Sequence, residues 1–326
     1  MGFWSNQRVL VAGGTGLIGI PLVKQLQESG ANVRVAAIND PYQVHSCEVE
    51  LTDLTDYQNC LRVTKEMDYV FNLMCIKGSP KAMKEQPARF FDALIPLSTC
   101  LGRASRANGV GGYLFTSSVG VYQPSEVMVE DSVWQTMPSK NDWFAGWAKR
   151  MGELQIEAYR IEYQWQNTAI VRPSNVYGHY DIFDKDKALF IAARIRQFAE
   201  REDPIVVWGD GSQIRDFIYS EDAARGIILA AEKGAGPINL CSGRSTTVKE
   251  VVEILASNAN YEPEIVFDTS KPAGDRKRIM DTSRLEALGF KPEMTLENGL
   301  KTTLEWYRSH SANVAKQYNI IDGNFR

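Results

Sequence analysis

The sequence predicts an α/β fold in which a doubly wound parallel sheet carries helices on both faces, and two observations predict it. Residues 9–12 form the short apolar run that a strand buried on both faces requires, and a cluster of glycines follows at once. Short apolar segments then alternate with helical patterns over the first half of the chain. This alternation indicates parallel strands joined by crossover helices, with ligands bound at the carboxyl ends of the strands.

The expected elements follow in chain order. A first helix begins after Gly16 and ends near Gly30. Strands are expected at residues 9–12, 33–38, 48–51, 69–74, 111–116 and 168–172, and long helices at 84–108 and 143–163. Beyond residue 172 the strict alternation lapses, and the later elements are helices at 187–200 and 247–256, strands at 205–208 and 238–241, a strand and helix within 216–233, and a charged loop at 274–281.

The order of the elements also predicts two domains that interleave, because no repeat or low-complexity linker divides the chain. We expect a dinucleotide-binding domain of residues 1–172 plus about 214–241. A smaller carboxyl-terminal substrate domain would take residues 173–213 and 242–326.

Composition limits the classes of partner. The chain has 326 residues and a net charge of -4, so no basic surface is available for nucleic acid or an anionic membrane. Its five cysteines form no CxxC pair, which is typical of free thiols in a reducing compartment and predicts no metal site. The sequence shows no signal peptide and no apolar run near the ~20 residues that span a bilayer. We therefore expect a cytoplasmic protein.

The glycine cluster after the first strand predicts an anion site. Glycines let the backbone turn tightly and approach a pyrophosphate, and the helix that follows presents free N–H groups and a positive dipole end. The strand before the loop and the amphipathic helix after it favour a dinucleotide. The alternative is a tight strand-to-helix turn that holds no ligand.

The choice between NAD and NADP is left open by the end of the second expected strand. An acidic residue there would bind the ribose 2′-hydroxyl and a basic one a 2′-phosphate, but Asn39 stands at this point and Asp40 comes late. Asp53 and Leu54, after the third strand, are candidates for the adenine edge. The alternative for this segment is an N-cap of the helix through Asp56.

Five motifs spread over nearly the whole chain resemble one family. They are residues 13–19 (GGTGLIG), the Asp53-Leu54 pair, residues 117–122 (SSVGVY), the helix that bears Lys149, and residues 172–178 (RPSNVYG). Together they resemble the extended short-chain dehydrogenase/reductase (NAD-dependent epimerase/dehydratase) family. That resemblance implies a Rossmann-type fold, NAD or NADP as cofactor, and a nucleotide diphosphate sugar as substrate. Residues 207–212, 215–217 and 266–272 are similar to the GDP-L-fucose synthase-like members, which favours a GDP-linked sugar.

The resemblance also implies catalytic roles. Ser118 takes the place of the residue that bonds the sugar oxygen, and Lys149 that of the lysine that holds the nicotinamide ribose and lowers the pKa of a tyrosine one turn earlier. The tyrosine position holds Ala145. Three explanations stay open: a deliberate inactivation, another proton carrier, or a non-catalytic binder. Candidate carriers are Tyr122, Tyr177, His179 and Tyr180.

The two residues after Ser118 narrow the implied reaction. Family dehydratases carry acids there, and fucose synthases carry a cysteine at the second place that works with a histidine. This chain has Val119 and Gly120, which transfer no proton. Hydride transfer at C4 remains, by a 4-epimerase or a 4-ketoreductase. The rival hypothesis is a catalytically silent nucleotide-sugar or NAD(P) sensor.

The resemblance assigns binding roles to two groups of residues. The expected cofactor contacts are Gly13, Thr15, Gly16, Leu17, Ile18, Asn39, Asp53, Leu54, Lys149 and Pro173. The expected substrate contacts are Lys77, Ser79, Ser118, Asn175, His179, Tyr180, Trp208, Arg215, Arg276 and Arg278. The arginines suit a diphosphate, because a guanidinium matches two phosphate oxygens. Their alternative is an ion pair with Asp216 or Asp275, and that of Trp208 is core packing.

The long helices predict self-association. The segment 84–108 carries more apolar surface than one helix face can bury, which together with the family resemblance favours a homodimer built from this helix and the one at 143–163.

Overall fold

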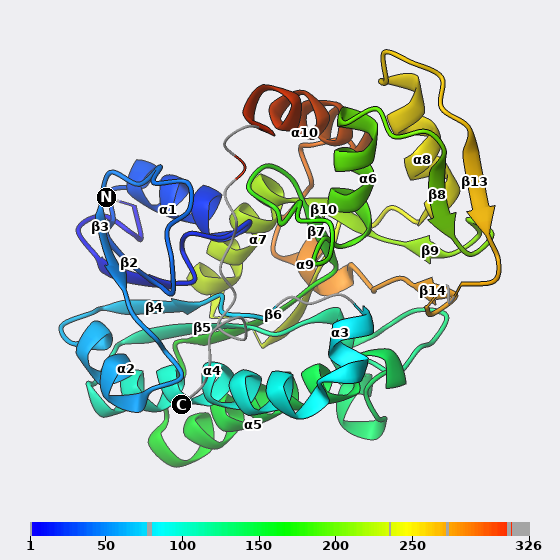
Figure 1. The fold of residues 1–326 in the computed structure, drawn as a ribbon. Helices are drawn as coiled ribbons and strands as arrows, with labels where there is room; N and C mark the ends of the chain where they lie inside the picture. Colours follow the sequence, from blue (N-terminus) through cyan, green and yellow to red (C-terminus); the bar gives the residue numbers. More distant parts are fainter. Residues whose placement is uncertain (1, 77–79, 235, 272–273, 312–313, 315–326) are drawn as a thin grey trace.

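The computed structural model describes residues 2–76, 80–234, 236–271, 274–311 and 314. A seven-stranded sheet in the order β11-β6-β5-β4-β1-β2-β3, parallel at every described pairing, forms its centre (Figure 1). Its strands are β1 (Arg8–Ala12), β2 (Asn32–Ala37), β3 (Glu48–Leu51), β4 (Tyr69–Asn72), β5 (Gly112–Thr116), β6 (Thr168–Pro173) and β11 (Pro237–Leu240). The chain reverses its winding between β1 and β4, where ligands bind in such sheets. The doubly wound Rossmann-type prediction is confirmed.

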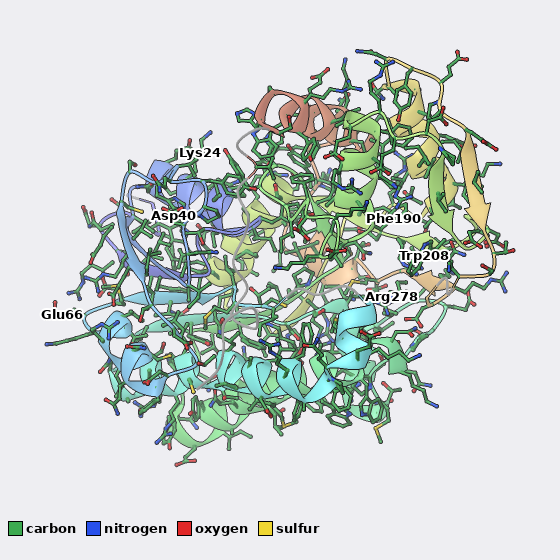
Figure 2. All side chains as sticks on the ribbon, viewed as in Figure 1. Lys24, Asp40, Glu66, Phe190, Trp208 and Arg278 are labelled. Atoms are coloured by element: carbon green, nitrogen blue, oxygen red, sulfur yellow. The ribbon has the colours of Figure 1, made fainter. Side chains whose placement is uncertain are left out.

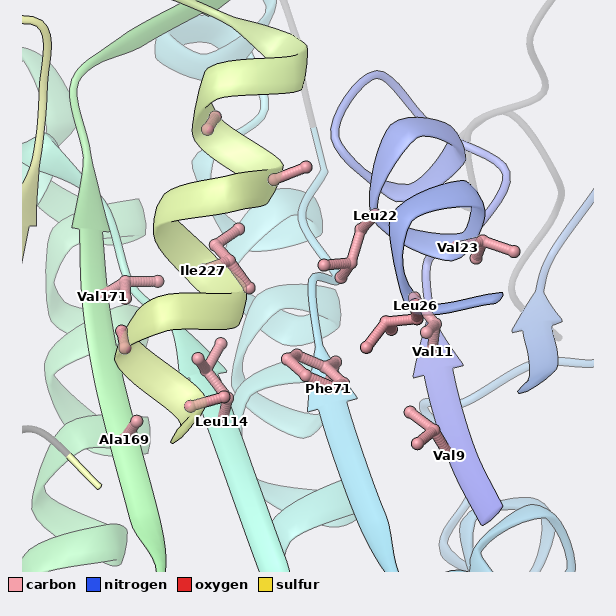
Figure 3. Close-up of a cluster of buried hydrophobic side chains, with 14 of the residues drawn as sticks. Val9, Val11, Leu22, Val23, Leu26, Phe71, Leu114, Ala169, Val171 and Ile227 are labelled. Carbon is pink, nitrogen blue, oxygen red and sulfur yellow. The ribbon is translucent and has the colours of Figure 1, made fainter. Parts of the chain in front are cut away.

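Helices cover both faces of this sheet because its strand residues alternate between two apolar cores. Val9, Val11 and Phe71 face a core shared with α1 (Gly19–Glu28) and α7 (Ser220–Lys233), and Figure 3 shows part of it. Leu10, Ala12 and their neighbours face the opposite core. That core is covered by α2 (Tyr57–Thr64), α4 (Pro87–Ala107) and α5 (Trp143–Tyr163), with the short α3 (Pro80–Glu85) leading into α4.

A smaller region with its own core lies beside the sheet. Its strands pair as β10 (Phe217–Tyr219) with β7 (Asn175–Tyr177), β13 (Ile265–Asp268) with β8 (Ile205–Trp208), and β9 (Ile214–Arg215) with both β12 (Thr246–Thr247) and β14 (Lys277–Arg278). Its helices are α6 (Phe190–Ala199), α8 (Val248–Ser257) and α10 (Leu296–His310), whereas α9 (Ser283–Ala287) packs against β11 and adds Leu285 to the core of the large sheet. Because β11 returns to the large sheet, the chain passes between the two regions more than once. The domain boundary at residue 172 stays a prediction.

Several expected boundaries move. The helix expected after Gly16 begins at Gly19, because residues 13–16 form a turn in which the Gly16 amide donates to the Gly13 carbonyl. The strand expected to reach residue 74 ends at Asn72, and the helix expected from 84 begins at Pro87, since proline suits a first helical position. Within the described part of the chain, no helix combines the length and apolarity that a membrane crossing needs.

Candidate active site

The glycine loop is shaped for a close-lying ligand. Gly13 has a φ of +83°, which favours glycine, and a Cβ on Gly19 would lie 2.3 Å from the Gly13 carbonyl oxygen. No side chain caps α1, and its first turn carries no acidic residue. The Ile20 amide donates to the Gly16 carbonyl and Pro21 has no N–H, so the groups that face an anion are the amides of the glycine loop and of the very start of α1. This arrangement fits the pyrophosphate of a dinucleotide. Thr15 and Leu17 are buried within the loop, and Gly16 and Ile18 complete it.

The region expected to hold the adenosine contains a residue that sequence reasoning missed. His45, in the loop after β2, places its Nε2 atom 3.0 Å from the Gly14 carbonyl oxygen. Asn39 lies half-buried just beyond β2, while the Asp40 carboxylate accepts a hydrogen bond from the Gln43 amide. A lone histidine far along the loop gives no local signal for this contact.

The loop after β3 contains two aspartates that accept hydrogen bonds from different groups. Asp56 caps α2, accepting hydrogen bonds from the Gln58 and Asn59 amides, so the N-cap role belongs to Asp56. Asp53 instead accepts hydrogen bonds from the amide and hydroxyl of Thr55, and Leu54 is buried. The adenine role of Asp53 and Leu54 stays a prediction.

Lys149 lies on α5 with its ammonium buried against the carboxyl ends of two sheet strands. Its Nζ atom donates to the carbonyls of Met74 and Thr116, both at 2.8 Å, and stands 5.0 Å from the centre of the Phe115 ring. Burial lowers the pKa of this ammonium. The lysine is thus held where β4 and β5 end, which is where ligands of such sheets bind.

Ser118 follows β5 and lies half-buried at the same edge of the sheet. Its hydroxyl accepts a hydrogen bond from the Gly120 amide at 3.0 Å and so caps the short 3-10 turn at Val119–Val121. A Cβ on Gly120 would lie 3.4 Å from the Ser118 Oγ atom and 3.3 Å from the Asp142 Cγ atom. Ser118 and Asp142 therefore line the space that a side chain at residue 120 would fill.

Ala145 occupies the first turn of α5, half-buried at the edge of the second core. It stands one turn before Lys149 on the same helix face, as the family pattern requires of the missing tyrosine. A methyl group there holds no proton to transfer.

The suggested substitute tyrosines are engaged elsewhere. The Tyr122 hydroxyl donates to the Asn239 side chain and accepts from Arg172, and burial raises its pKa. Burial also raises the pKa of Tyr177, whose hydroxyl packs against Gly299 of α10. Both phenols are therefore poor proton carriers near neutral pH.

His179 and Tyr180 pack on the side of α10. The His179 ring stacks on Trp306 with centroids 5.2 Å apart, and burial lowers its pKa. Tyr180 has a φ of +63° and packs edge-on against Tyr42 and Trp306. The roles suggested for both stay predictions.

The three candidate arginines have different surroundings. Arg278 pairs with Asp275 and Asp142, so the ion pair with Asp275 that the sequence left open is present. Arg276 is exposed. Arg215 is mostly buried and donates to the carbonyl of its neighbour Ile214, and among the described residues no carboxylate lies within ion-pair distance of it.

Arg215 is consequently the strongest candidate for an anion. Burial, and after it the charge of Arg278, lower its pKa to about 10, while the more distant charges of Asp275 and Asp142 oppose this shift. The guanidinium stays charged at neutral pH, and within the described structure it forms no ion pair. Asp216, the other suggested partner, is instead bonded to Ser174 and Ser242.

The remaining residues predicted to contact cofactor or substrate lie in several different elements. Trp208 is 51% exposed at the end of β8, which contradicts the core-packing alternative (Figure 2). Asn175 donates its side-chain amide to the Asp216 carbonyl, and Pro173 ends β6. Lys77 and Ser79 lie outside the described residues.

A buried polar network supports the serine loop, and sequence reasoning missed it. Glu153 of α5 accepts hydrogen bonds from the Ser117 hydroxyl and from two nitrogens of Arg172, at 2.9 and 2.6 Å. Arg172 also donates to the Tyr122 hydroxyl. Burial alone would lower the pKa of Arg172, but the hydrogen bonds and charge of Glu153 raise it. The network joins α5, β6 and the residue before Ser118.

The strand order, the glycine loop and the Ser118–Lys149 edge define a dinucleotide-dependent oxidoreductase of the short-chain type. The family model described as "NAD dependent epimerase/dehydratase family" matches residues 9–241, and the chain belongs to that family. It is an NAD(P)-dependent enzyme of the extended short-chain type.

Individual relatives agree with this assignment. The chain is 31% identical over 311 residues to a protein named putative GDP-L-fucose synthase 2 of Arabidopsis thaliana, covering 93% of this chain and 92% of the relative. A UDP-glucose 4-epimerase of Thermotoga maritima, solved with UDP-glucose, superposes with a TM-score of 0.81 at 27% identity, over 93% of this chain and 99% of the other. MoeE5, solved with UDP-glucuronic acid and NAD, gives 0.79 at 27% identity, over 93% and 99%.

Proposed function

We propose that this enzyme transfers hydride at C4 of a nucleotide diphosphate sugar, as a 4-epimerase or a 4-ketoreductase. The observation that carries the proposal is the placement of Ser118 and the Lys149 ammonium at one edge of the sheet, beyond β5 and β4. Bound NAD or NADP supplies the hydride acceptor or donor. The glycine loop and the uncapped start of α1 hold its pyrophosphate, Lys149 holds the nicotinamide ribose, and Ser118 orients the sugar oxygen.

A GDP-linked sugar is the favoured substrate. The relative named GDP-L-fucose synthase supports it, whereas the solved neighbours contain UDP-linked sugars. Trp208, exposed at the end of β8, offers a ring for stacking on the base. Val119 and Gly120 disfavour dehydration and epimerisation at C3 and C5, because neither carries a proton donor.

Replacing Arg215 by Met should weaken binding of the free nucleotide diphosphate by ~10 to 100-fold, because a charge-assisted hydrogen bond contributes about 1.5–3 kcal/mol. Titration calorimetry with GDP and UDP measures the Kd of each variant. The control is Arg244→Met, which removes an exposed ion pair with Glu297 and should leave the Kd within ~2-fold. Equal affinity of Arg215→Met and the parent would remove Arg215 from the diphosphate site.

A silent nucleotide-sugar or NAD(P) binder is the second candidate, and Ala145 favours it. Single-turnover hydride transfer separates the two, measured by nicotinamide absorbance and product mass with both cofactors and GDP-, UDP- and dTDP-linked 4-keto sugars. The parent should react with one sugar class. Ligand binding without reaction in the parent and in Ala145→Tyr would support the silent binder.

The Ala145→Tyr variant adds a phenol one turn before Lys149. If proton transfer limits the parent, Ala145→Tyr should transfer hydride at least ~10²-fold faster than the parent. Ala145→Phe adds the same ring without the hydroxyl and should give no increase. A gain in both variants would indicate packing rather than proton transfer.

We also propose a cytoplasmic homodimer. All five cysteines are free thiols, which supports a reducing compartment. α4 and α5 pack side by side, and Leu154, Ile161 and Tyr163 of α5 are exposed apolar side chains that a second copy would cover. A monomeric mass in solution would contradict the dimer.

A further inference from the structure

Asp142 lies where it could take part in the proton transfer for which the family uses a tyrosine and this chain has Ala145. Asp142 precedes α5 at its N-cap position, yet its carboxylate makes no capping hydrogen bond. Aspartate at this position ordinarily accepts hydrogen bonds from the first helix amides. Here the side chain turns instead toward residue 120 and toward Arg278 of β14.

Three distances place the carboxylate and Ser118 around residue 120. A Cβ on Gly120 would lie 3.1 Å from the Asp142 Cβ atom, 3.3 Å from its Cγ atom and 3.4 Å from the Ser118 Oγ atom. The Ser118 hydroxyl and the Asp142 carboxylate thus flank the same small space. Any larger residue at position 120 would meet Asp142 at close range.

The place of Asp142 in the chain adds a second argument. Ala145 and Lys149 are four positions apart and share one face of the first turns of α5, and Asp142 directly precedes this helix. The carboxylate therefore stands at the end of the helix where the alanine lies. The carboxylate side chain is also partly exposed, at 26%, so a ligand can reach it.

We propose that the Asp142 carboxylate is the catalytic proton acceptor and donor at the sugar oxygen that Ser118 orients. This inference rests on the proposed function. In the oxidative direction the sugar O–H bond breaks and its proton passes to Asp142, while the C4–H electron pair leaves as hydride to the oxidised nicotinamide and the C4=O bond forms. In the reductive direction the protonated Asp142 returns the proton as hydride arrives at C4.

Arg278 positions this carboxylate. Its Nη2 atom lies 2.5 Å from an Asp142 oxygen and is shared with Asp275, which also accepts hydrogen bonds from Ser139 and Asn141 of the loop before α5. Arg278 therefore ties the loop to β14 through one Asp142 oxygen, and the other oxygen accepts no hydrogen bond from any described residue, which leaves it for the substrate.

The test uses Asp142→Ala in the full chain, with single-turnover hydride transfer as the readout. The rate should fall by ~10² to 10⁴-fold, the range for losing a positioned acid–base group. Formate, a small carboxylate, should raise the rate of Asp142→Ala at least ~10-fold and should not raise the rate of the parent. The Kd for GDP should remain within ~3-fold of the parent value, which shows that the site is folded.

Asp275→Asn is the matched control because it also removes a carboxylate from Arg278, whereas the carboxylate nearest to residue 120 is that of Asp142. Its rate should fall by less than ~10-fold, without formate rescue. Equal rates in the parent and Asp142→Ala, or a loss that formate does not restore and that Asp275→Asn shares, would overturn the role of Asp142 while the proposed function stands. A parent that transfers no hydride to any sugar overturns both.

Discussion

Replacing Lys149 by Met is expected to reduce single-turnover hydride transfer by ~10² to 10⁴-fold, comparable to removing a positioned proton-transfer group. The ammonium donates to the carbonyls of Met74 and Thr116. Methionine fills a similar volume but leaves both buried carbonyls without a donor, at a cost of about 1–3 kcal/mol each. The ends of β4 and β5 then lose the ammonium that bonds both of them, and the nicotinamide ribose loses the cation proposed to hold it.

The control for this variant is Lys140→Met. Lys140 is exposed just before α5, and its replacement should leave the rate within ~2-fold because surface charges contribute little. Binding of GDP at the Arg215 side serves as a folding check. A Lys149→Met rate within ~3-fold of the parent would show that this lysine is structural only.

Replacing Glu153 by Gln should lower the free energy of unfolding by about 3–5 kcal/mol, because it leaves the Arg172 charge buried without its counter-ion. The Arg172 and Glu153 side chains are 0% and 2% exposed. The loss should appear as an earlier midpoint in urea-induced unfolding followed by tryptophan fluorescence. Catalysis should also fall, since Glu153 accepts a hydrogen bond from the hydroxyl of Ser117, which precedes the proposed catalytic residue Ser118.

Two variants complete this experiment. Asp131→Asn removes an exposed ion pair with Arg284 and should cost no more than about 1 kcal/mol. The double variant Glu153→Gln with Arg172→Met removes both charges and should recover part of the stability lost in the single variant. A loss below about 1 kcal/mol in Glu153→Gln would mean that water reaches and solvates Arg172.

The fold class, the glycine loop and the order of the elements could be predicted from the sequence because they depend on neighbouring residues. A strand buried on both faces needs a continuous apolar run, and a strand-to-helix turn at a ligand needs glycines such as Gly13 and Gly19. The motif spacing likewise marked Ser118, Lys149 and the alanine at 145. The first-helix start and several other ends moved, because turn hydrogen bonds decide where a helix begins, and α3, β13 and α10 were not predicted.

Contacts between distant segments were decided by the tertiary structure alone. Arg215 and Arg278 are alike in sequence, yet the fold pairs Arg278 with two carboxylates and leaves Arg215 without one in the described structure. Glu153 meets Arg172 because α5 packs on β6. Asp142 and Ser118 flank the same space because residue 120 has no side chain, and Arg278 of β14 bonds the Asp142 carboxylate. Side-chain partners depend on which crossovers bring elements together, and sequence spacing does not contain that information.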